Sequence, residues 1–375
     1  MTTSQAPAAG AVRHLYVHLP FCASRCGYCA FVVEVGALDR RDAYLEAVLA
    51  ELDREAGRLG ALESVYLGGG TPTLMRGRRI ARLLERIGPM LAPGAEVTVE
   101  ANPETVERRL LRELRAAGVT RVSLGVQSFQ PHLLRALERQ ATPEVARRAA
   151  GCARAAGFES LSVDLLFAVP GQTPADLESD LAEVVALGPD HVSWYELELK
   201  PGSRLGQTGL EAFDEDAAAD AYRRVVAGLE EAGYRWYETA NFARPGHECR
   251  HSRAYWGAAD YLGIGVGAVS TVAGLRWRNA PGLGRYLAAL AAGEPPPRTA
   301  EPLDADTRRR ERWMLALRLD EPLDLAWAGP PDHPEAVERL RRLGLVRGGD
   351  GAALALTREG RFLQNAVLHE LMEYR

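Results

Sequence analysis

The chain lacks a long hydrophobic run. None of its apolar stretches approaches the roughly 20 residues that a membrane-spanning helix needs. Its first residues, MTTSQAPAAGAVRHL, contain no apolar core after a basic start, unlike a secretory signal peptide. An excess of positive charge is missing too, since the formal net charge is −5. We therefore expect a cytoplasmic protein that does not bind nucleic acid.

Cysteine is scarce and unevenly distributed. The chain has five cysteines, an odd number, and three of them, Cys22, Cys26 and Cys29, fall within eight positions. In a reducing compartment such a cluster indicates a metal site or a catalytic site rather than disulfides. Cys152 falls at an apolar position of a predicted helix, and we expect it to be a small core residue.

A repeated unit of strand, turn and helix fills the first half of the chain. Alternation of this kind predicts class α/β, with a parallel sheet and right-handed crossovers. Six strands predict a partial (β/α)6 TIM-like barrel, and an eight-stranded barrel would need strands from beyond residue 200. The predicted strands are 14–19, 64–69, 96–101, 121–126, 160–167 and 191–197, and the predicted helices are 41–58, 78–90, 104–117, 143–156 and 174–187.

The remaining sequence predicts further domains. Residues 1–13 are expected to be a flexible N-terminus before a barrel core at 14–210. Residues 211–295, with a helix at 215–232 and many aromatics and glycines, are expected to extend the barrel. GEPPPRTAEPLD (293–304) has the composition of a linker. Helices at 305–319 and 333–343, a hairpin near 346–356 and a last helix at 358–374 predict a winged-helix-like module over 305–375.

The spacing Cys22-x-x-x-Cys26-x-x-Cys29 suits an iron–sulfur cluster. Three thiolates hold three irons of a [4Fe–4S] cubane and leave the fourth iron open. An open iron can bind the amino and carboxylate groups of S-adenosylmethionine, and an electron passed into the sulfonium then releases methionine and a 5′-deoxyadenosyl radical. The alternative is a structural zinc site, which needs a fourth ligand. His14 and His18 are the candidates, although their spacing is unusual for zinc.

Glycines and polar residues follow the predicted strands, at the sheet edge where α/β proteins bind ligands. The glycines of Gly68-Gly69-Gly70-Thr71-Pro72 allow a ligand to approach the backbone closely. Glu100 can accept from the ammonium of methionine, and Arg139 can bind its carboxylate. Gln127 and Asp164 can bind ribose hydroxyls. Each residue alone is more simply a surface charge or a satisfied polar group, but their placement at successive strand ends favours a binding site.

A second motif, Gly246-His247-Glu248-Cys249-Arg250-His251, precedes Tyr255-Trp256. A histidine beside aromatics and glycines can ligate haem iron, and Cys249 is a second candidate ligand. The alternative is a hydrogen-bonding histidine packed under an aromatic cluster, which the spacing alone favours.

Seven segments together resemble one family. They are YVHLPFCASRCGYCAF, GGGTP, EANPE, SLGVQSF, DLLFAVPGQT, YETANFARPGHECRHSRAYW and LTREGRFLQNAVLHEL, in this order from about Leu15 to Leu371. They are similar to the HemW branch of the oxygen-independent coproporphyrinogen III oxidase family, which is built on a radical-SAM barrel. The dehydrogenase branch of that family carries a fourth cysteine two positions after the third, and here that position is Phe31.

The resemblance implies a haem chaperone, which binds haem and delivers it to haem-requiring respiratory proteins without converting coproporphyrinogen. The cluster and S-adenosylmethionine would then serve structure, dimerisation or regulation, and the partners would include a second copy of the chain and, transiently, membrane proteins. The resemblance places the cluster on Cys22, Cys26 and Cys29, the haem ligand on His251, and the S-adenosylmethionine contacts on Tyr16, Tyr28, Gly69, Gly70, Thr71, Glu100, Gln127, Arg139 and Asp164.

Three positions depart from the family pattern. Ser252 replaces asparagine in the haem motif HNxxYW, Ala141 replaces a histidine after Arg139, and Lys200 stands where glutamate is frequent. Whether the protein is an enzyme stays open. The alternatives are a radical-SAM methyltransferase, which would need a second S-adenosylmethionine, another porphyrin-modifying enzyme, or a zinc-binding interaction protein.

Overall fold

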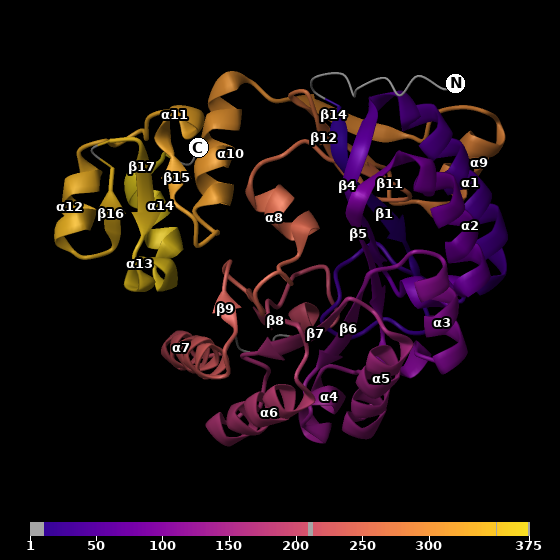
Figure 1. Cartoon of the computed structure of the whole chain (residues 1–375), viewed down its shortest axis with the longest axis horizontal. Helices are drawn as coiled ribbons and strands as arrows, with labels where there is room; N and C mark the ends of the chain where they lie inside the picture. Colours follow the sequence, from indigo (N-terminus) through magenta and orange to yellow (C-terminus); the bar gives the residue numbers. More distant parts are fainter. Residues whose placement is uncertain (1–10, 209–212, 350, 374–375) are drawn as a thin grey trace.

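The computed structural model describes residues 11–208, 213–349 and 351–373 of the chain. A curved sheet with helices along its outer side forms the larger part of the molecule, and a small C-terminal module lies beside it (Figure 1). No helix within these ranges is long and apolar enough to cross a membrane.

Nine strands of the described residues form the curved sheet, in the order β11-β1-β4-β5-β6-β7-β8-β10-β9. The central six are parallel and correspond to the six predicted strands: β1 (Val12–Leu19), β4 (Leu59–Gly69), β5 (Leu91–Ala101), β6 (Arg121–Gln127), β7 (Ser160–Phe167) and β8 (His191–Glu196). β11 (Leu262–Ile264) is parallel to β1, whereas β10 (Asn241–Ala243) and β9 (Arg235–Trp236) continue antiparallel beyond β8. The sheet has two free ends, so the predicted α/β class with a partial TIM-like barrel is confirmed.

Helices connect the strands and cover the outer face of the sheet (Figure 1). They are α1 (Arg41–Glu55), α2 (Gly77–Ile87), α3 (Arg108–Ala116), α4 (Pro131–Ala136), α5 (Pro143–Ala156), α6 (Pro174–Leu187) and α7 (Glu215–Glu231). Short 3-10 turns flank them at η1 (Leu38–Arg40), η2 (Ala56–Arg58), η3 (Pro72–Met75), η4 (Gly88–Met90), η5 (Pro103–Thr105) and η6 (Leu205–Gln207). Three predicted helices are therefore shorter than expected, because their ends wind into η2, η4 and η5.

The bounds of α5 and α6 agree with the prediction because the sequence marks both ends. Thr142 and Thr173 cap the N-termini with their side chains, and a proline follows each. Gly157 and Gly188 end the two helices in the left-handed conformation that glycine adopts without strain.

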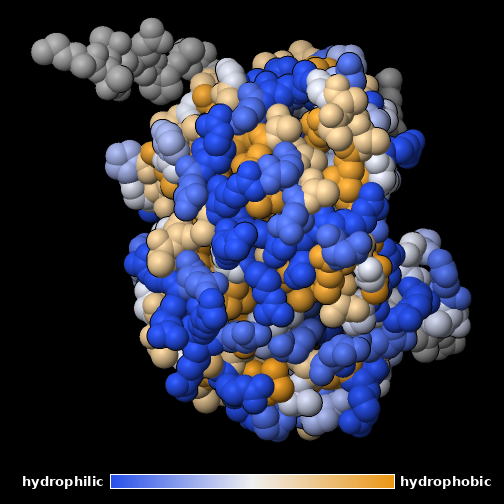
Figure 2. All heavy atoms as spheres, turned by 90° about the vertical axis from the view of Figure 1, so that its right-hand side faces the viewer, coloured by the Kyte–Doolittle hydropathy of each residue, from blue (hydrophilic) through white to orange (hydrophobic). Residues whose placement is uncertain are grey.

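The face that carries α1 and α2 is mainly hydrophilic. Figure 2 shows hydrophilic residues interspersed with small hydrophobic areas over this side of the molecule. Ion pairs join the two helices, including Arg79 with Asp42 and Arg86 with Asp53. Such exposed pairs contribute little stability each, so the helices are held mainly by their buried faces.

The central strands alternate between two environments. Val17, Leu67 and Val99 belong to the main hydrophobic core under the helices. Residues between such positions, including Ser123 and Asp164, line a cavity on the concave side. The inner face of this open barrel is therefore polar, in contrast to the apolar filling of a closed eight-stranded barrel.

Residues 213–303 complete the barrel part with α8 (Arg250–Trp256), α9 (Leu283–Ala291) and a small antiparallel sheet of β12 (Val269–Val272), β13 (Leu275–Asn279) and β14 (Arg298–Pro302). The prediction of a linker over 293–304 is wrong for β14, which pairs with β13 along its length. Its composition misleads because β14 is an exposed edge strand, where proline is tolerated.

The C-terminal module has its own core, which includes Trp313, Leu340 and Leu354. Its elements are α10 (Ala305–Ala316), β15 (Leu323–Asp324), α11 (Leu325–Ala328), α12 (Ala336–Arg342), β16 (Val346–Gly348), β17 (Ala353–Leu356), α13 (Arg358–Phe362) and α14 (Gln364–Leu371). This order, with β17 between β15 and β16, is that of a winged helix, as predicted. The last predicted helix is interrupted at Leu363, and Tyr374 lies outside the described residues.

Candidate functional site

The three clustered cysteines lie on one loop between β1 and α1. Cys22 ends the short strand β2 (Phe21–Cys22), which pairs with β3 (Glu34–Val35) further along the same loop. Gly27 ties the middle of the loop to neighbouring segments, because its N–H donates to Leu137 O (3.2 Å) and its carbonyl accepts from Leu205 N (2.8 Å). Protein contacts therefore shape the loop on both sides of the cysteines.

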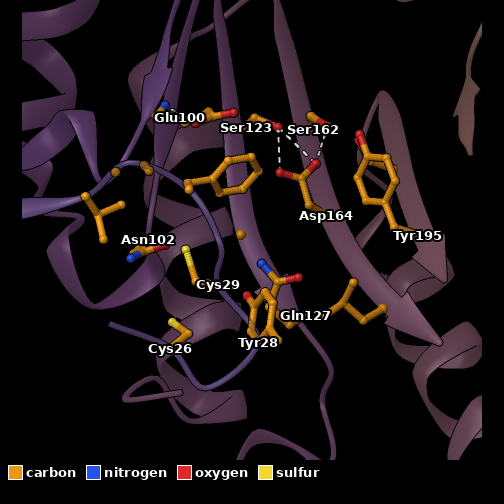
Figure 3. Close-up of a pocket in the computed structure, with 18 of the residues that line it drawn as sticks. Cys26, Tyr28, Cys29, Glu100, Asn102, Ser123, Gln127, Ser162, Asp164 and Tyr195 are labelled. Atoms are coloured by element: carbon orange, nitrogen blue, oxygen red, sulfur yellow. Dashed lines mark hydrogen bonds between the residues drawn. The ribbon is translucent and has the colours of Figure 1, made fainter. Parts of the chain in front are cut away.

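All three cysteines line a cavity of about 590 Å³ at the end of the barrel where the strands finish (Figure 3). Several of the residues predicted to bind S-adenosylmethionine line it as well, namely Tyr28, Gly69, Gly70, Glu100, Gln127, Arg139 and Asp164. Tyr16, Thr71 and His251 are not among the lining residues. The strand ends thus bring together most, but not all, of the predicted site.

The donor set fits a cluster better than a single metal ion. No three His, Cys, Asp or Glu side chains within the described ranges converge as ligands of one ion would. Three thiolates suit three irons of a cubane cluster, whose fourth iron then stays open to a small ligand. Burial raises the pKa of Cys22 to about 11, so its thiolate needs a cationic partner such as iron.

The histidines considered for a zinc site face other partners. His18 Nδ1 accepts from Tyr16 OH (3.0 Å), and its Nε2 donates to Val32 O (2.8 Å). His14 Nδ1 is hydrogen-bonded to Ser64 Oγ (2.9 Å). Neither ring lines the cavity, so neither supplies a fourth ligand there.

The glycines at the end of β4 allow close packing beneath the cysteine loop. A Cβ on Gly69, whose φ is +113°, would lie 2.6 Å from the His18 ring. A Cβ on Gly70 would lie 2.6 Å from the backbone of Pro20. The N–H groups of Gly70 and Thr71 donate to backbone carbonyls at the end of β1 (2.9 Å) and in β2 (2.8 Å). These residues therefore fix the start of the loop, and a ligand's ammonium would have to bind acceptors elsewhere.

Glu100, at the end of β5, supplies such an acceptor. Its Oε1 accepts from Tyr66 OH (2.8 Å) and its Oε2 from Gly69 N (3.1 Å). Burial, together with the negative charge of Asp164, raises the pKa of Glu100 to about 7. A cation bound beside Glu100 would stabilise its ionised form, which suits the ammonium of an amino acid.

A bulge at the end of β6 directs Gln127 into the cavity. The register with β7 shifts between Gly125 and Gln127, and Gln127 has a φ of +73°, which is uncommon for a residue other than glycine. Arg139 lies next to the bulge, where its Nη2 donates to Gly125 O (2.6 Å) and Asn102 Oδ1 (3.2 Å). Its Nη1 donates to Cys26 Sγ (3.4 Å), so Arg139 joins the strand ends to the cysteine loop.

Asp164 on β7 is surrounded by serine hydroxyls (Figure 3). Ser123 Oγ lies 3.0 Å from both carboxylate oxygens, and Ser162 Oγ lies 3.3 Å from Oδ1. Burial raises the pKa of Asp164. Tyr195 on β8 stands beside this carboxylate and is 44% exposed, since its ring faces the open cavity. Paired hydroxyls, such as those of a ribose, suit this carboxylate.

His251, on α8, is enclosed behind the cavity wall. His251 is only 5% exposed, and its ring stacks on Tyr66 with the two ring centroids 5.3 Å apart. Its Nδ1 is hydrogen-bonded to Ser64 Oγ (2.9 Å), whereas no described residue partners its Nε2. Burial lowers the pKa of His251 to about 3, so the ring is neutral, as a haem ligand must be. Iron could reach Nε2 only if the surrounding aromatic rings moved.

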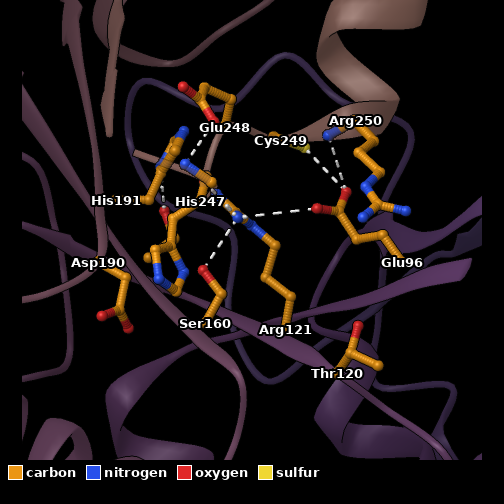
Figure 4. A network of polar contacts seen from close by, with 12 residues as sticks. Glu96, Thr120, Arg121, Ser160, Asp190, His191, His247, Glu248, Cys249 and Arg250 are labelled. Atoms are coloured by element: carbon orange, nitrogen blue, oxygen red, sulfur yellow. Dashed lines mark hydrogen bonds and ion pairs between the residues drawn. The ribbon is translucent and has the colours of Figure 1, made fainter. Parts of the chain in front are cut away.

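A buried polar network at the base of the cavity is absent from the sequence-based predictions (Figure 4). Arg121 Nη1 donates to His247 O (2.8 Å) and faces Glu96 Oε2 (3.8 Å). Glu96 Oε1 accepts from Arg250 N (3.1 Å) and from Cys249 Sγ (3.5 Å). Burial raises the pKa of Cys249 to about 12, so this thiol is protonated. Cys249 is therefore a hydrogen-bonding residue in this network rather than a reactive thiolate.

The sequence does contain a signal for this network. Polar residues alternate with apolar ones in successive strands, as in Glu96-Val97-Thr98-Val99-Glu100, Arg121-Val122-Ser123 and Ser160-Leu161-Ser162-Val163-Asp164. Strands covered on both faces by apolar layers would not show this period of two. A polar inner face of the barrel could therefore have been predicted from the strands themselves.

Comparisons with known proteins agree on one superfamily. The Radical SAM superfamily matches residues 16–184. The heme chaperone HemW of Mycobacterium tuberculosis (strain H37Rv) is 39% identical, over 98% of this chain and 96% of its own length. The heme chaperone HemW of Bacillus subtilis (strain 168) is 30% identical, over 95% and 98%. The solved structure of the radical SAM enzyme coproporphyrinogen III oxidase (HemN) from Escherichia coli has a TM-score of 0.84 at 26% identity, and covers 97% of this chain and 91% of that one.

Proposed function

Because the chain belongs to the HemW family of radical SAM proteins, we propose that it is a haem chaperone, which binds haem and delivers it to haem-requiring respiratory proteins. One observation carries the proposal. The similarity to proteins named heme chaperones extends over 98% of the chain, so that it includes the barrel, the α8 motif and the C-terminal module. The proposed setting is the cytoplasm, with a homodimer as the working form and transient contacts to membrane-bound recipients.

Two cofactors belong to this proposal. Cys22, Cys26 and Cys29 would hold a [4Fe–4S] cluster, and S-adenosylmethionine would occupy the cavity beside them. When bound and reduced, such a cluster supplies an electron to the sulfonium of S-adenosylmethionine. In a chaperone the same pair of cofactors would serve structure, dimerisation or regulation.

The residues of the chain would bind and orient S-adenosylmethionine. Glu100 would accept from its ammonium, and Arg139 would donate to its carboxylate in a charge-assisted pair. Gln127 and Asp164 would bind the ribose hydroxyls, and Tyr28 would pack against the ligand. Thr71 and Tyr16 would act from behind the cavity wall, as positioning residues: Thr71 Oγ1 lies 3.6 Å from Cys22 Sγ, and Tyr16 OH donates to His18.

The proposal includes haem ligation by His251 and the absence of coproporphyrinogen dehydrogenase activity. The neutral, unpartnered Nε2 of His251 supports the first part. Phe31, in place of the fourth cysteine of the dehydrogenase branch, supports the second. If His251 ligates the iron, its substitution by alanine should change the Soret band of the haem-loaded protein, and an unchanged band would remove His251 as the axial ligand.

A second candidate is a porphyrin-modifying radical SAM enzyme. The TM-score of 0.84 with the E. coli coproporphyrinogen III oxidase favours it. The two functions differ in their products, since an enzyme would convert a porphyrin substrate with consumption of S-adenosylmethionine, whereas a chaperone would return haem unchanged.

Anaerobic determination of iron, sulfide and haem tests the proposed function. We expect about four irons and four sulfides per chain after reconstitution, and haem bound in stoichiometric amount. Cys26→Ala should lose the iron and sulfide, whereas Cys152→Ala, on α5 and outside the cavity, should keep both. Iron without sulfide would contradict the cluster, a missing Soret band would contradict the chaperone, and a modified porphyrin product would establish the second candidate.

A further inference from the structure

The rim of the cavity carries an exposed aromatic ring. Phe31, two residues after Cys29, lines the cavity and is nevertheless 68% exposed. Val33 lines the same rim, and Val35, on β3, is 49% exposed. Exposed apolar residues grouped beside a ligand cavity are typical of an interaction surface.

Two exposed cations line the same cavity as Phe31 and Val33. Arg25, just before Cys26, and Lys200, beyond β8, both line the cavity, and Lys200 is the one lysine of the chain. Lys200 Nζ lies 3.3 Å from Glu198 Oε2, but the two side chains are 54% and 76% exposed. The Arg25 guanidinium makes a long hydrogen bond to Val33 O (3.4 Å). Exposed contacts of this kind are weak, so both cations can exchange their partners for the carboxylates of a ligand.

The interior of the cavity does not suit a porphyrin. Its wall carries the polar side chains of Glu100, Ser123 and Asp164, which lie where a flat apolar ring would have to pack. A volume of about 590 Å³ is that of a pocket for one small ligand, and the proposed S-adenosylmethionine would already occupy it. His251 lies behind Tyr66 and is 5% exposed, so it does not offer an initial contact. A flat apolar macrocycle is therefore expected at the rim.

We propose that the rim formed by Phe31, Val33 and Val35, together with the cations Arg25 and Lys200, is the docking site for haem. One porphyrin face covers Phe31, and the two propionates pair with Arg25 and Lys200. Lys200 gives up its ion pair with Glu198 when it binds the propionate. The inference rests on the proposed chaperone function and names the surface on which haem is received. Haem then lies on the cysteine loop itself, and the same loop supports both haem and the cluster.

Porphyrin titration of the cluster-loaded protein with S-adenosylmethionine tests this site. Haem is followed by its Soret band and iron-free protoporphyrin IX by its fluorescence. Phe31→Asp should weaken both ligands about tenfold, because it removes the covered apolar ring and adds a charge that repels propionates. Protoporphyrin IX should bind to the wild-type protein as haem does, since docking needs no iron ligand. Leu343→Asp, at a 64% exposed leucine of the C-terminal module, is the matched control and should leave both ligands unchanged.

The outcomes separate this inference from the proposed function. If the wild-type protein binds no haem, the chaperone function fails. If it binds haem and Phe31→Asp binds both ligands as tightly as the wild type does, or if the wild type binds haem but not protoporphyrin IX, the rim is not the docking site. Circular dichroism of each variant verifies that the fold is retained.

The single lysine allows a second test on the wild-type protein. The rate of reductive methylation of Lys200 should fall several-fold when haem is bound. Mass spectrometry of the peptide that contains Lys200 measures this rate. Lys200→Glu should weaken haem binding a few-fold at low salt, with a smaller effect at high salt. Equal methylation rates with and without haem would show that the propionates do not reach Lys200.

Discussion

At the scale of single residues, removal from water governs what the charged groups of the site can do. Glu100 and Asp164 are carboxyls whose pKa burial raises, in a cavity proposed to receive a cationic amino acid and a ribose. The sequence motifs place Cys22, Glu100 and Asp164 at or near strand ends, and the structure brings all three to the wall of one cavity. Motifs could not predict that His251 turns away from the cavity, because that depends on how α8 packs against Tyr66.

The affinity for S-adenosylmethionine should depend on the ionisation of Glu100. Its pKa of about 7 means that the carboxyl is largely protonated at pH 6 and ionised at pH 8, where it would accept more strongly from the N–H groups of the ligand's amino nitrogen. Calorimetric titration of the cluster-loaded protein should therefore give a lower Kd at pH 8 than at pH 6. Glu100→Gln should weaken binding roughly 10- to 100-fold and remove this pH dependence.

Glu107→Gln is the control for this measurement, since Glu107 is exposed and pairs with Arg76 away from the cavity. It should retain the wild-type affinity and pH dependence. Binding by Glu100→Gln that still tightens from pH 6 to pH 8 would assign the titration to another group.

At the scale of elements, local signals and long-range packing contributed unequally to what could be predicted. α5 and α6 agree with their predicted bounds because caps, prolines and terminal glycines act locally. β14 was missed because an exposed edge strand gains its pairing from β13, and its proline-rich composition resembles a loop. β11 was missed as well, because it is a three-residue strand and no local pattern indicates its place beside β1.

α1 is joined to the segment after β11 by one buried carboxylate. Glu51 Oε2 accepts from Gly265 N (2.8 Å) and Tyr286 OH (2.6 Å), and its Oε1 accepts from Asn279 Nδ2 (2.6 Å). Even when it is protonated, the Glu51 carboxyl has acceptor lone pairs on both oxygens, whereas Glu51→Gln would replace one oxygen by an NH₂ group that cannot accept from these donors. We expect it to lower the free energy of unfolding by about 1–3 kcal/mol, measured by urea denaturation near pH 5.

The difference in unfolding free energy between the wild type and Glu51→Gln should depend on pH. Burial raises the pKa of Glu51 to about 7, above its ordinary value of 4.5, so the folded state holds the proton more tightly than the unfolded chain does. As the pH rises from about 4.5 through about 7, the wild type should lose stability relative to Glu51→Gln, and the gap at pH 8 should be smaller than at pH 5. Glu46→Gln, at an exposed position of the same helix, should show no such change. A gap that is equal at both pH values would contradict the shifted pKa.

At the scale of the whole molecule, the C-terminal module is attached through aromatic and cationic contacts. Phe362 packs against Trp236 and Tyr222 of the barrel part, with centroids 5.0 and 5.4 Å apart. Arg361 lies over the Trp236 ring at 3.5 Å and donates to Trp236 O (2.8 Å). The predicted division at 14–210, 211–295 and 305–375 stays a prediction. β11, from the second of these segments, belongs to the same sheet as the barrel strands.

Phe362→Ala should loosen the module from the barrel. The loss of a partly buried ring is expected to cost about 2 kcal/mol, less than for a fully buried phenylalanine. In calorimetry the variant should show a separate transition for the module at lower temperature, because the module retains its own core around Trp313. Leu363→Ala, at a residue 45% exposed, should melt like the wild type, and a single unshifted transition in Phe362→Ala would show that the interface contributes little.

The anchoring of the cysteine loop has a consequence for how the protein acquires iron. β2–β3 pairing, the Gly70 and Thr71 amides and the His18–Val32 hydrogen bond all help to define the loop's path. In a zinc finger the metal supplies the folding free energy, and removal of the ion unfolds the domain. Because protein contacts also hold the loop of this chain, we expect the chain to stay folded in a chelator and the loading and loss of iron to be reversible.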